Sequence, residues 1–218
     1  MSVIVTGSAR GIGKAVAEKF LSEGESVVGI DLASSAIEHP LYTHIRSDLT
    51  KNLPDVPTDV SVLICCHGVQ EPEEDCVAIN LLSTIKAVEK YAFTPAIKAV
   101  LVVASASARN GSEFPYYVAS KAGVVGYVKN VALRLAPYGA VANTLSPGGV
   151  LTESNSSVLD DPDLRAEAIG ESLLRKWATP EEIAEWAYFL TVKNRSMTGE
   201  DILVDNGEQL KSNFVWKK

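Results

Sequence analysis

Short apolar runs alternate with amphipathic segments along almost the whole chain, and this alternation constrains the fold more than any other feature. Seven runs have the continuous apolar character of strands buried on both faces: residues 2–6, 26–31, 42–46, 60–66, 99–104, 139–145 and 201–205. Segments with helical periodicity lie between them, at 11–23, 77–93, 117–136 and 180–192. This alternation predicts a three-layer α/β fold around a mostly parallel sheet.

Length and charge narrow the class further. The chain has 218 residues, 46% of them apolar, which suits one domain spanning 1–218. A formal charge of −7 argues against binding to nucleic acid, and the lack of a long apolar run or a leading signal predicts a cytoplasmic protein without a membrane partner. The three cysteines, Cys65, Cys66 and Cys76, have neither the number of a disulfide framework nor the spacing of a metal site.

Several connections depart from a plain alternation of strand and helix. The segments 32–41 and 47–59 are too short for a full crossover helix, and Pro54 and Pro57 work against one, so extended loops and a thinly covered sheet edge are expected there. The polar segment 152–163 is interpreted as a loop or lid. The last helix should begin at Thr179-Pro180, a cap residue followed by a proline at the first helical position.

A glycine-rich turn follows the first strand directly and precedes the first helix. Its glycines, Gly7, Gly11 and Gly13, allow a sharp turn and the close approach of a pyrophosphate to backbone amides and the positive helix end. Asp31 ends the second strand, 18 residues beyond Gly13, where a carboxylate can accept both ribose hydroxyls and repel a 2′-phosphate. NAD is therefore favoured over NADP, although Arg10 could bind that phosphate.

A second group of residues points to proton transfer. Tyr117 and Lys121 lie four residues apart and therefore on one helix face. A phenol exchanges a proton near neutral pH only where a cation stabilises the phenolate, and Lys121 can supply that charge. Ser105, at the end of the fifth strand, could polarise a carbonyl at which hydride arrives.

Taken in order, these motifs resemble the short-chain dehydrogenase/reductase family over essentially the whole chain. The resemblance rests on the turn Thr6–Gly13, Asp31, Asp48, Asn80, Ser105, Tyr117-xxx-Lys121, Asn143–Gly148, Thr152 and Thr198–Gly207. It implies a single-domain Rossmann fold with strand order 3-2-1-4-5-6-7, shortened or missing helices after strands 2 and 3, and a substrate flap at about 150–178. The layout is similar to that of 3-alpha-hydroxysteroid dehydrogenase/carbonyl reductases.

The resemblance also implies roles for particular residues. Tyr117 would be the general acid/base, Lys121 would lower its pKa and hold the nicotinamide ribose, Ser105 would orient the substrate oxygen, and Asn80 would position a water leading from Lys121. The residues implied in cofactor binding are Gly7, Ser8, Arg10, Gly11, Ile12, Gly13, Asp31, Leu32, Asp48, Leu49, Cys66, Gly68, Tyr117, Lys121, Pro147, Gly148, Val150 and Thr152.

Two departures from the family pattern place limits on this transfer. Where the family usually has Asn-Asn-Ala-Gly after the fourth strand, this chain has Cys65-Cys66-His67-Gly68, so the asparagine contacts must be replaced or lost. His67 is interpreted as a structural histidine and the two cysteines as packing residues. The spacing of 12 from Ser105 to Tyr117 is one short of the commonest family spacing, which leaves Ser107 as an alternative to Ser105.

These observations predict an NAD-dependent oxidoreductase that interconverts a secondary alcohol and a ketone. The substrate could be steroid-like, alicyclic or a polyol, and the apolar flap residues either contact it or pack the flap: Val158, Leu159, Leu164, Ile169, Leu173, Leu174 and Trp177. The alternative is a non-catalytic, NAD-responsive regulator on the same fold. The resemblance further implies a homodimer or homotetramer, in which the tail Phe214-Val215-Trp216 could dock on a neighbouring subunit.

Overall fold

Seven parallel strands form the sheet, and their order confirms the sequence-based prediction. The structure is a computed structural model that describes residues 1–56, 59–112 and 114–210. The strand order is β3-β2-β1-β4-β5-β6-β7. Strands β1 to β3 therefore extend the sheet towards one edge and β4 to β7 towards the other, and the order reverses between the neighbours β1 and β4. The strands are β1 (Ser2–Thr6), β2 (Ser26–Asp31), β3 (Tyr42–Arg46), β4 (Val62–Cys65), β5 (Ala99–Val103), β6 (Val141–Pro147) and β7 (Asp201–Val204).

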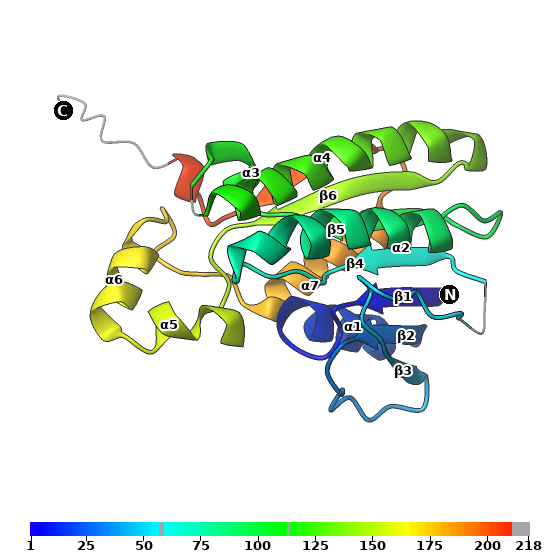
Figure 1. Cartoon of the computed structure of the whole chain (residues 1–218), viewed down its shortest axis with the longest axis horizontal. Coiled ribbons are helices and arrows are strands. Elements are labelled where there is room, and N and C mark those ends of the chain that lie inside the picture. Colours follow the sequence, from blue (N-terminus) through cyan, green and yellow to red (C-terminus); the bar gives the residue numbers. More distant parts are fainter. Residues whose placement is uncertain (57–58, 113, 211–218) are drawn as a thin grey trace.

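Helices cover both faces of this sheet, which gives three layers (Figure 1). On one face lie α2 (Ser83–Tyr91) and α4 (Pro115–Leu135), and on the other lie α1 (Gly11–Ser22) and α7 (Pro180–Tyr188). The short α3 (Ser107–Asn110) precedes α4, and α5 (Ser156–Leu159) and α6 (Pro162–Gly170) project beyond one end of the sheet. The strands' apolar side chains point alternately into the two cores, as parallel strands covered on both faces require.

The element boundaries correct the sequence-based prediction in detail. β6 lies two residues later than expected, β4 is shorter than 60–66, and the segment expected to be one helix at 77–93 consists of a π-helical segment, η2 (Val77–Leu82), followed by α2. The helix expected at 180–192 likewise ends in a π-helical segment, η5 (Phe189–Lys193). Thr179 does start α7, with the reciprocal capping box that its side chain forms with Glu182.

The segment 152–163 is helical over much of its length, which corrects its interpretation as a loop and leaves the lid as a prediction. It contains η4 (Glu153–Asn155), α5 and the start of α6. Asp161 caps α6 because its side chain accepts hydrogen bonds from the amides of Asp163 and Leu164, and Pro162 occupies the first helical position. A polar composition hid these caps, since aspartate and proline are as frequent in loops as at helix starts.

No helix follows β2 or β3 within the described segments 32–41, 47–56 and 59–61, as the short connections predicted. Side chains cover that edge instead. Tyr42 from β3 lies over Gly29, where a side chain would overlap the phenol oxygen, and the Tyr42 hydroxyl bonds to Ser8 and His44. The edge strand β3 is therefore only partly buried.

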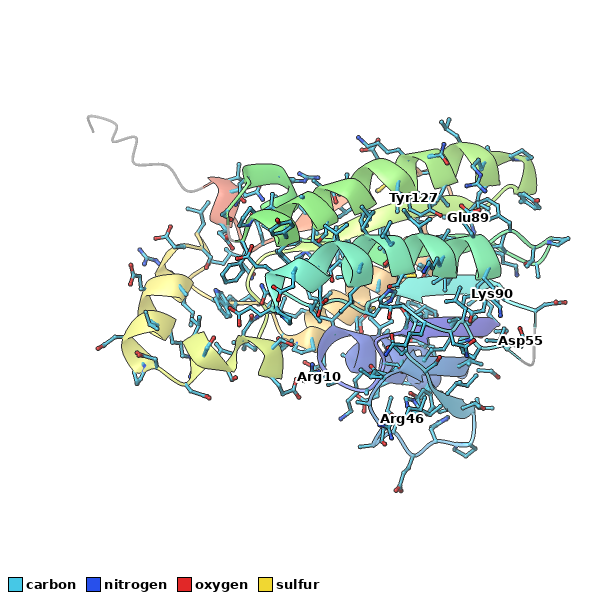
Figure 2. All side chains as sticks on the ribbon, viewed as in Figure 1. Arg10, Arg46, Asp55, Glu89, Lys90 and Tyr127 are labelled. Carbon is cyan, nitrogen blue, oxygen red and sulfur yellow. The ribbon has the colours of Figure 1, made fainter. Side chains whose placement is uncertain are left out.

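Ion pairs and hydrogen bonds join the two helices on the α4 face. Figure 2 shows Tyr127 on α4 beside Glu89 on α2, and the Tyr127 hydroxyl donates to Glu89 at 2.9 Å. Arg134 donates to both oxygens of Glu89. Residues 124–128 of α4 form an apolar run that packs on the chain's own core, where Val124 and Val128 are each 1% exposed. This packing accounts for the run without a partner subunit.

Candidate active site

A cleft of about 540 Å³ opens at the carboxyl ends of the strands, on both sides of the point where the strand order reverses. It brings together nearly all the residues that the sequence analysis assigned to catalysis or cofactor binding. The exceptions are Ser8 and Asn80, which lie behind the lining. The predicted residues that line the cleft are Gly7, Arg10, Gly11, Ile12, Gly13, Asp31, Leu32, Asp48, Leu49, Cys66, Gly68, Ser105, Tyr117, Lys121, Pro147, Gly148, Val150 and Thr152.

The glycine turn forms one wall and leaves no space for larger residues. Gly7 has a φ of +70°, and a Cβ there would lie 2.6 Å from the backbone nitrogen of His67. A Cβ on Gly13 would overlap the carbonyl oxygen of Gly7. Helix α1 starts at Gly11 with neither a side-chain cap nor an acidic residue in its first turn. This arrangement fits a pyrophosphate group.

Asp31 stands at the tip of β2 with its carboxylate fixed by two backbone amides. Its Oδ2 accepts from Ala9 at 3.0 Å and its Oδ1 from Ala33 at 2.9 Å. Each oxygen keeps a lone pair for a further donor, such as a ribose hydroxyl. Arg10 lies at the turn before α1, whereas Arg46 on β3 donates its Nε–H to the carbonyl of Leu32 (Figure 2).

Ser8 does not present its side chain to the cleft. It is fully buried, and its hydroxyl forms the hydrogen bond to Tyr42 described above. Asp48 does line the cleft, and its Oδ1 accepts from the amide and hydroxyl of Thr50. The Thr50 hydroxyl and the Lys51 ammonium hold the pKa of Asp48 below its ordinary value. Asp48 is thus a carboxylate at the far wall, beside buried Leu49.

The departure from the family pattern after β4 is compensated by His67. Its Nδ1 lies 2.6 Å from the Thr6 hydroxyl at the end of β1, and its Nε2 lies 2.8 Å from the Ser83 hydroxyl and 3.2 Å from that of Thr84. The ring therefore ties β1 to α2 with three hydroxyl contacts. Burial, with the Lys121 charge as the second cause, lowers the pKa of His67 to about 4. This is the structural histidine that the sequence analysis expected.

The adjacent cysteines are packing residues, and all three cysteines of the chain are free thiols. Cys65 is buried on β4, and its burial raises the thiol pKa to about 12. Burial also raises the pKa of Cys66, whose side chain borders the cleft. Neither thiol is a nucleophile at neutral pH, because the thiolate is the reactive form.

Asn80 is 1% exposed and lies behind Gly68 rather than in the cleft. Its Oδ1 accepts from the amide of Val69, and its Nδ2 donates to the carbonyl of Val69 and to the Ser120 hydroxyl at 3.0 Å. A Cβ on Gly68 would lie 3.0 Å from the Asn80 Oδ1 and 3.3 Å from the Lys121 Nζ. Asn80 therefore connects the turn after β4 to α4, and it sits in a π-helical segment, a frequent local feature of functional sites.

The proton-transfer group gathers where α4 begins. Lys121 is 6% exposed, its Nζ donates to the carbonyl of Val103 at 3.0 Å, and this nitrogen lies 5.7 Å from the centre of the Tyr117 ring. Ser105, directly after β5, is 7% exposed and borders the same cleft. Residues distant in sequence thus bring a phenol, an ammonium and a hydroxyl to one wall.

The flap end of the cleft is more polar than the sequence suggested. Of the seven apolar flap residues that the sequence singled out, Trp177 borders the cleft, and its ring covers Gly149. Leu164, Leu173 and Leu174 are about half exposed or more, at 47%, 53% and 66%. Of the two alternatives for these side chains, contact with the substrate and packing of the flap, the first is open in this structure to Trp177, which borders the cleft.

Two carboxylates that sequence reasoning missed border this end: Glu171 and Glu208. Glu208 is partly buried beside Gly148, and burial, followed by the nearby Asp205 carboxylate, raises its pKa. A signal was available, because Glu208 follows β7 closely and the carboxyl ends of parallel strands converge on one cleft. No group of three or more metal-ligating side chains and no helix long and apolar enough to cross a membrane occurs within the described ranges.

Comparison with known proteins agrees with this geometry. A family model described as "Enoyl-(Acyl carrier protein) reductase" matches residues 71–209. The chain is 31% identical to "Short chain dehydrogenase adrF" of Penicillium roqueforti, covering 69% of this chain and 70% of that protein. It is 26% identical to "L-rhamnose 1-dehydrogenase (NADP(+))" of Thermoplasma acidophilum, covering 94% and 95%. The solved structure of Thermoplasma acidophilum aldohexose dehydrogenase matches with a TM-score of 0.85 at 23% identity, covering 100% of this chain and 97% of that one.

Proposed function

Because the chain belongs to the short-chain dehydrogenase/reductase family, we propose that it is an NAD(H)-dependent oxidoreductase that interconverts a secondary alcohol and a ketone. The observation that carries the proposal is the convergence of Tyr117, Lys121 and Ser105 on the cleft that the glycine turn enters. Such a constellation serves proton transfer to a substrate oxygen. A protein that only bound a dinucleotide would not need it.

The residues present fit a nicotinamide dinucleotide. The glycine turn provides the space that a Cβ would fill, Asp31 provides acceptors for ribose hydroxyls, and Gly148 borders the cleft beside the proton-transfer group. When bound, the dinucleotide supplies the hydride acceptor or donor. Lys121 would hold the ribose nearest the reacting ring.

The chain's own residues move the proton. In the direction of oxidation, the Tyr117 phenolate accepts the hydroxyl proton of the alcohol, and the Lys121 ammonium one helical turn away stabilises that phenolate. Ser105 donates a hydrogen bond to the substrate oxygen and so favours the carbonyl that forms. Asn80 holds the turn at Gly68 and Val69 beside Lys121, which keeps the ammonium in place.

Asp31 supports NAD over NADP. A 2′-phosphate on the ribose would place negative charge against this carboxylate, whose orientation the amides of Ala9 and Ala33 fix. Arg10 also borders the cleft and is exposed, so it can turn into solvent. We therefore assign the preference for NAD to the fixed carboxylate of Asp31 rather than to the mobile guanidinium of Arg10, although one relative named above uses NADP(+).

The flap end of the cleft favours an uncharged, polyhydroxylated alcohol over a steroid. Glu171 and Glu208 are hydrogen-bond acceptors for hydroxyl groups, and their charge disfavours an anionic substrate. Ser154 and Asn155 add further polar atoms from the start of the flap at about 150–178. Trp177 provides a flat apolar surface of the kind on which sugar rings pack.

Assembly and compartment follow from family membership and the chemistry of the thiols. We place the protein in the cytoplasm, because its three cysteines are free and two are deeply buried. The homodimer or homotetramer is proposed from the family alone, since α4 packs on its own core. The predicted docking tail Phe214-Val215-Trp216 lies outside the described residues.

Substitution of Tyr117 tests the proposed reaction. We expect Tyr117→Phe to lower kcat by about 10³-fold, in the range for loss of a general acid/base, while NAD affinity stays within about twofold. NADH absorbance across a panel of sugars, polyols, alicyclic alcohols and steroids gives the rates, and calorimetry gives the affinity. A folded, NAD-binding Phe variant with wild-type turnover would show the mechanism to be wrong. Tight NAD binding by a wild type that oxidises nothing in the panel would favour the regulator instead.

A further inference from the structure

Ser107 is a buried side chain at the cleft that the proposed mechanism leaves without a role. It is the first residue of α3, two positions beyond Ser105, and it is 2% exposed. Ser107 borders the same cleft as Tyr117 and Lys121. In the sequence, Ser107 was an alternative to Ser105 as the residue that orients the substrate oxygen. The structure shows how the two hydroxyl groups are arranged.

The hydrogen bonds between the two serines run in one direction. The Ser107 amide donates to the Ser105 Oγ at 3.2 Å, and the Ser107 hydroxyl donates to the same oxygen at 2.8 Å. A serine hydroxyl has two acceptor sites and one proton. With both acceptor sites occupied by Ser107, the remaining capacity of Ser105 is to donate its proton. A donor is what a substrate carbonyl oxygen requires.

The backbone between the two serines is held from both sides. The Ala106 amide donates to the carbonyl of Pro147 at 2.8 Å, which continues the bonding between β5 and β6. The Gln209 side chain donates to the Ala106 carbonyl, also at 2.8 Å. Gln209 lies in the short C-terminal turn η6 (Glu208–Leu210), and Asp205 caps this turn by accepting from the amides of Gly207 and Gln209.

These contacts fix Ser107 relative to Ser105 by bonds to segments more than 40 residues away. The Arg109–Asp201 ion pair at 2.6 Å adds a further anchor, from α3 to the start of β7. The Ser107 backbone therefore cannot move away from Ser105 without breaking contacts to β6, β7 or η6, and the hydrogen bond to the Ser105 Oγ holds the Ser107 hydroxyl. A hydroxyl held this way is preorganised, and no reorientation is needed when the substrate binds.

We propose that Ser107 is a positioning residue that sets the Ser105 hydroxyl as a hydrogen-bond donor to the substrate oxygen. The inference rests on the proposed function, since it assigns Ser107 a part in the same reaction. Ser107 itself does not contact the reacting atoms. It acts through Ser105, and it should affect the chemical step more than the binding of either ligand.

A double-substitution cycle tests this role. Ser107→Ala removes the hydroxyl donor and keeps the amide bond, so we expect kcat to fall about tenfold, the value of one hydrogen bond, with the NAD dissociation constant within twofold. Ser107→Thr keeps a hydroxyl and should recover most of the loss. In a Ser105→Ala background, Ser107→Ala should change kcat by less than twofold, because the group it positions is gone.

The outcomes separate this inference from a structural role and from the proposed function. An equal fall of kcat in both backgrounds would show that Ser107 only supports the loop. An unchanged or faster Ser107→Ala enzyme would show that Ser105 does not depend on it, or that Ser105 donates to Ser107. If either result is found while Tyr117→Phe still loses activity as expected, the inference about Ser107 is overturned and the proposed function stands. Turnover that survives Tyr117→Phe would overturn the proposed function and this inference with it.

Discussion

The two halves of the cleft are constructed in different ways. In the cofactor half, formed by β1 to β3 and the turns after them, glycines let backbone atoms approach closely where a Cβ would not fit, as at Gly7 and Gly13. In the catalytic half, formed by β4 to β7 and the turns after them, the wall consists of buried polar side chains such as Ser105 and Lys121, each held by a hydrogen bond. Substitutions that add atoms should therefore be most damaging in the cofactor half, and substitutions that remove atoms should be most damaging in the catalytic half.

The halves also differ in how firmly they are covered. The connections after β2 and β3 carry no helix within their described parts, and β3 remains partly exposed. β4 and β5 are buried along their full length between helices on both faces. Proton transfer needs atoms fixed in place, whereas a flexible dinucleotide can be bound by loops that tolerate small movements. The strands that precede the proton-transfer residues, β4 and β5, are thus more deeply buried than the edge strand β3.

Among the changes that test this comparison of the two halves, the largest effect is expected from adding one methyl group to the cofactor half. In Gly13→Ala the new Cβ would overlap the Gly7 carbonyl oxygen, so the start of α1 must move away from β1. We expect NAD affinity, measured by calorimetry, to fall at least about 100-fold, because the amides of the turn would no longer face the pyrophosphate. Gly126→Ala is the matched control, since a Cβ there meets no atom within 4 Å. If Gly13→Ala bound NAD like the control, the cofactor half would not depend on close backbone approach.

His67, which connects β1 of the cofactor half to α2, should limit the stability of the protein in acid. His67 has an ordinary pKa of 6.5 and a folded pKa of about 4, so the folded state binds fewer protons than the unfolded state as the pH falls between these values. The stability contributed by the neutral ring is present above pH 6.5 and is lost towards pH 4. We expect the free energy of unfolding in urea to decrease by about 2 kcal/mol from this group between pH 7 and pH 5.

Two variants isolate that contribution. His67→Asn removes the titrating ring and should show a pH dependence that is smaller by this amount, although its stability at pH 7 is also expected to be lower. His39→Asn changes an exposed histidine far from this contact and is the control. Equal slopes for all three proteins would mean that His67 does not couple β1 to α2 in its neutral form.

The smallest effect concerns a charge at the edge of the cofactor half. Asp31→Asn keeps the shape of the side chain and removes the negative charge, so we expect the ratio of kcat/KM with NADP to that with NAD to rise about tenfold. Asp55→Asn is the control, because Asp55 is an almost fully exposed carboxylate paired with Lys90 outside the cleft (Figure 2). An unchanged ratio in Asp31→Asn would mean that another residue selects the cofactor, with Arg10 as the first candidate.

The sequence predicted more of the fold than of the site. Strand order was confirmed, as was the lack of a helix in the described parts of the connections after β2 and β3, and the glycine turn, Asp31, Tyr117 and Lys121 all line one cleft. The helices of the flap were missed, because the cap at Asp161 resembles a loop in composition. The positions of Ser8 and Asn80 behind the cleft wall could not be predicted either, since a motif does not specify where a side chain points.

What the sequence determined by itself is the pattern of burial and the places where the backbone must turn. Apolar periodicity and glycine act over a few residues, so they can be recognised without knowledge of the rest of the chain. Only the tertiary structure decided which polar atoms meet, as in the pairs His67 with Thr6 and Gln209 with Ala106. Their partners lie 61 and 103 residues apart, and a hydrogen bond a few ångströms long exists only after the strands between them have been placed.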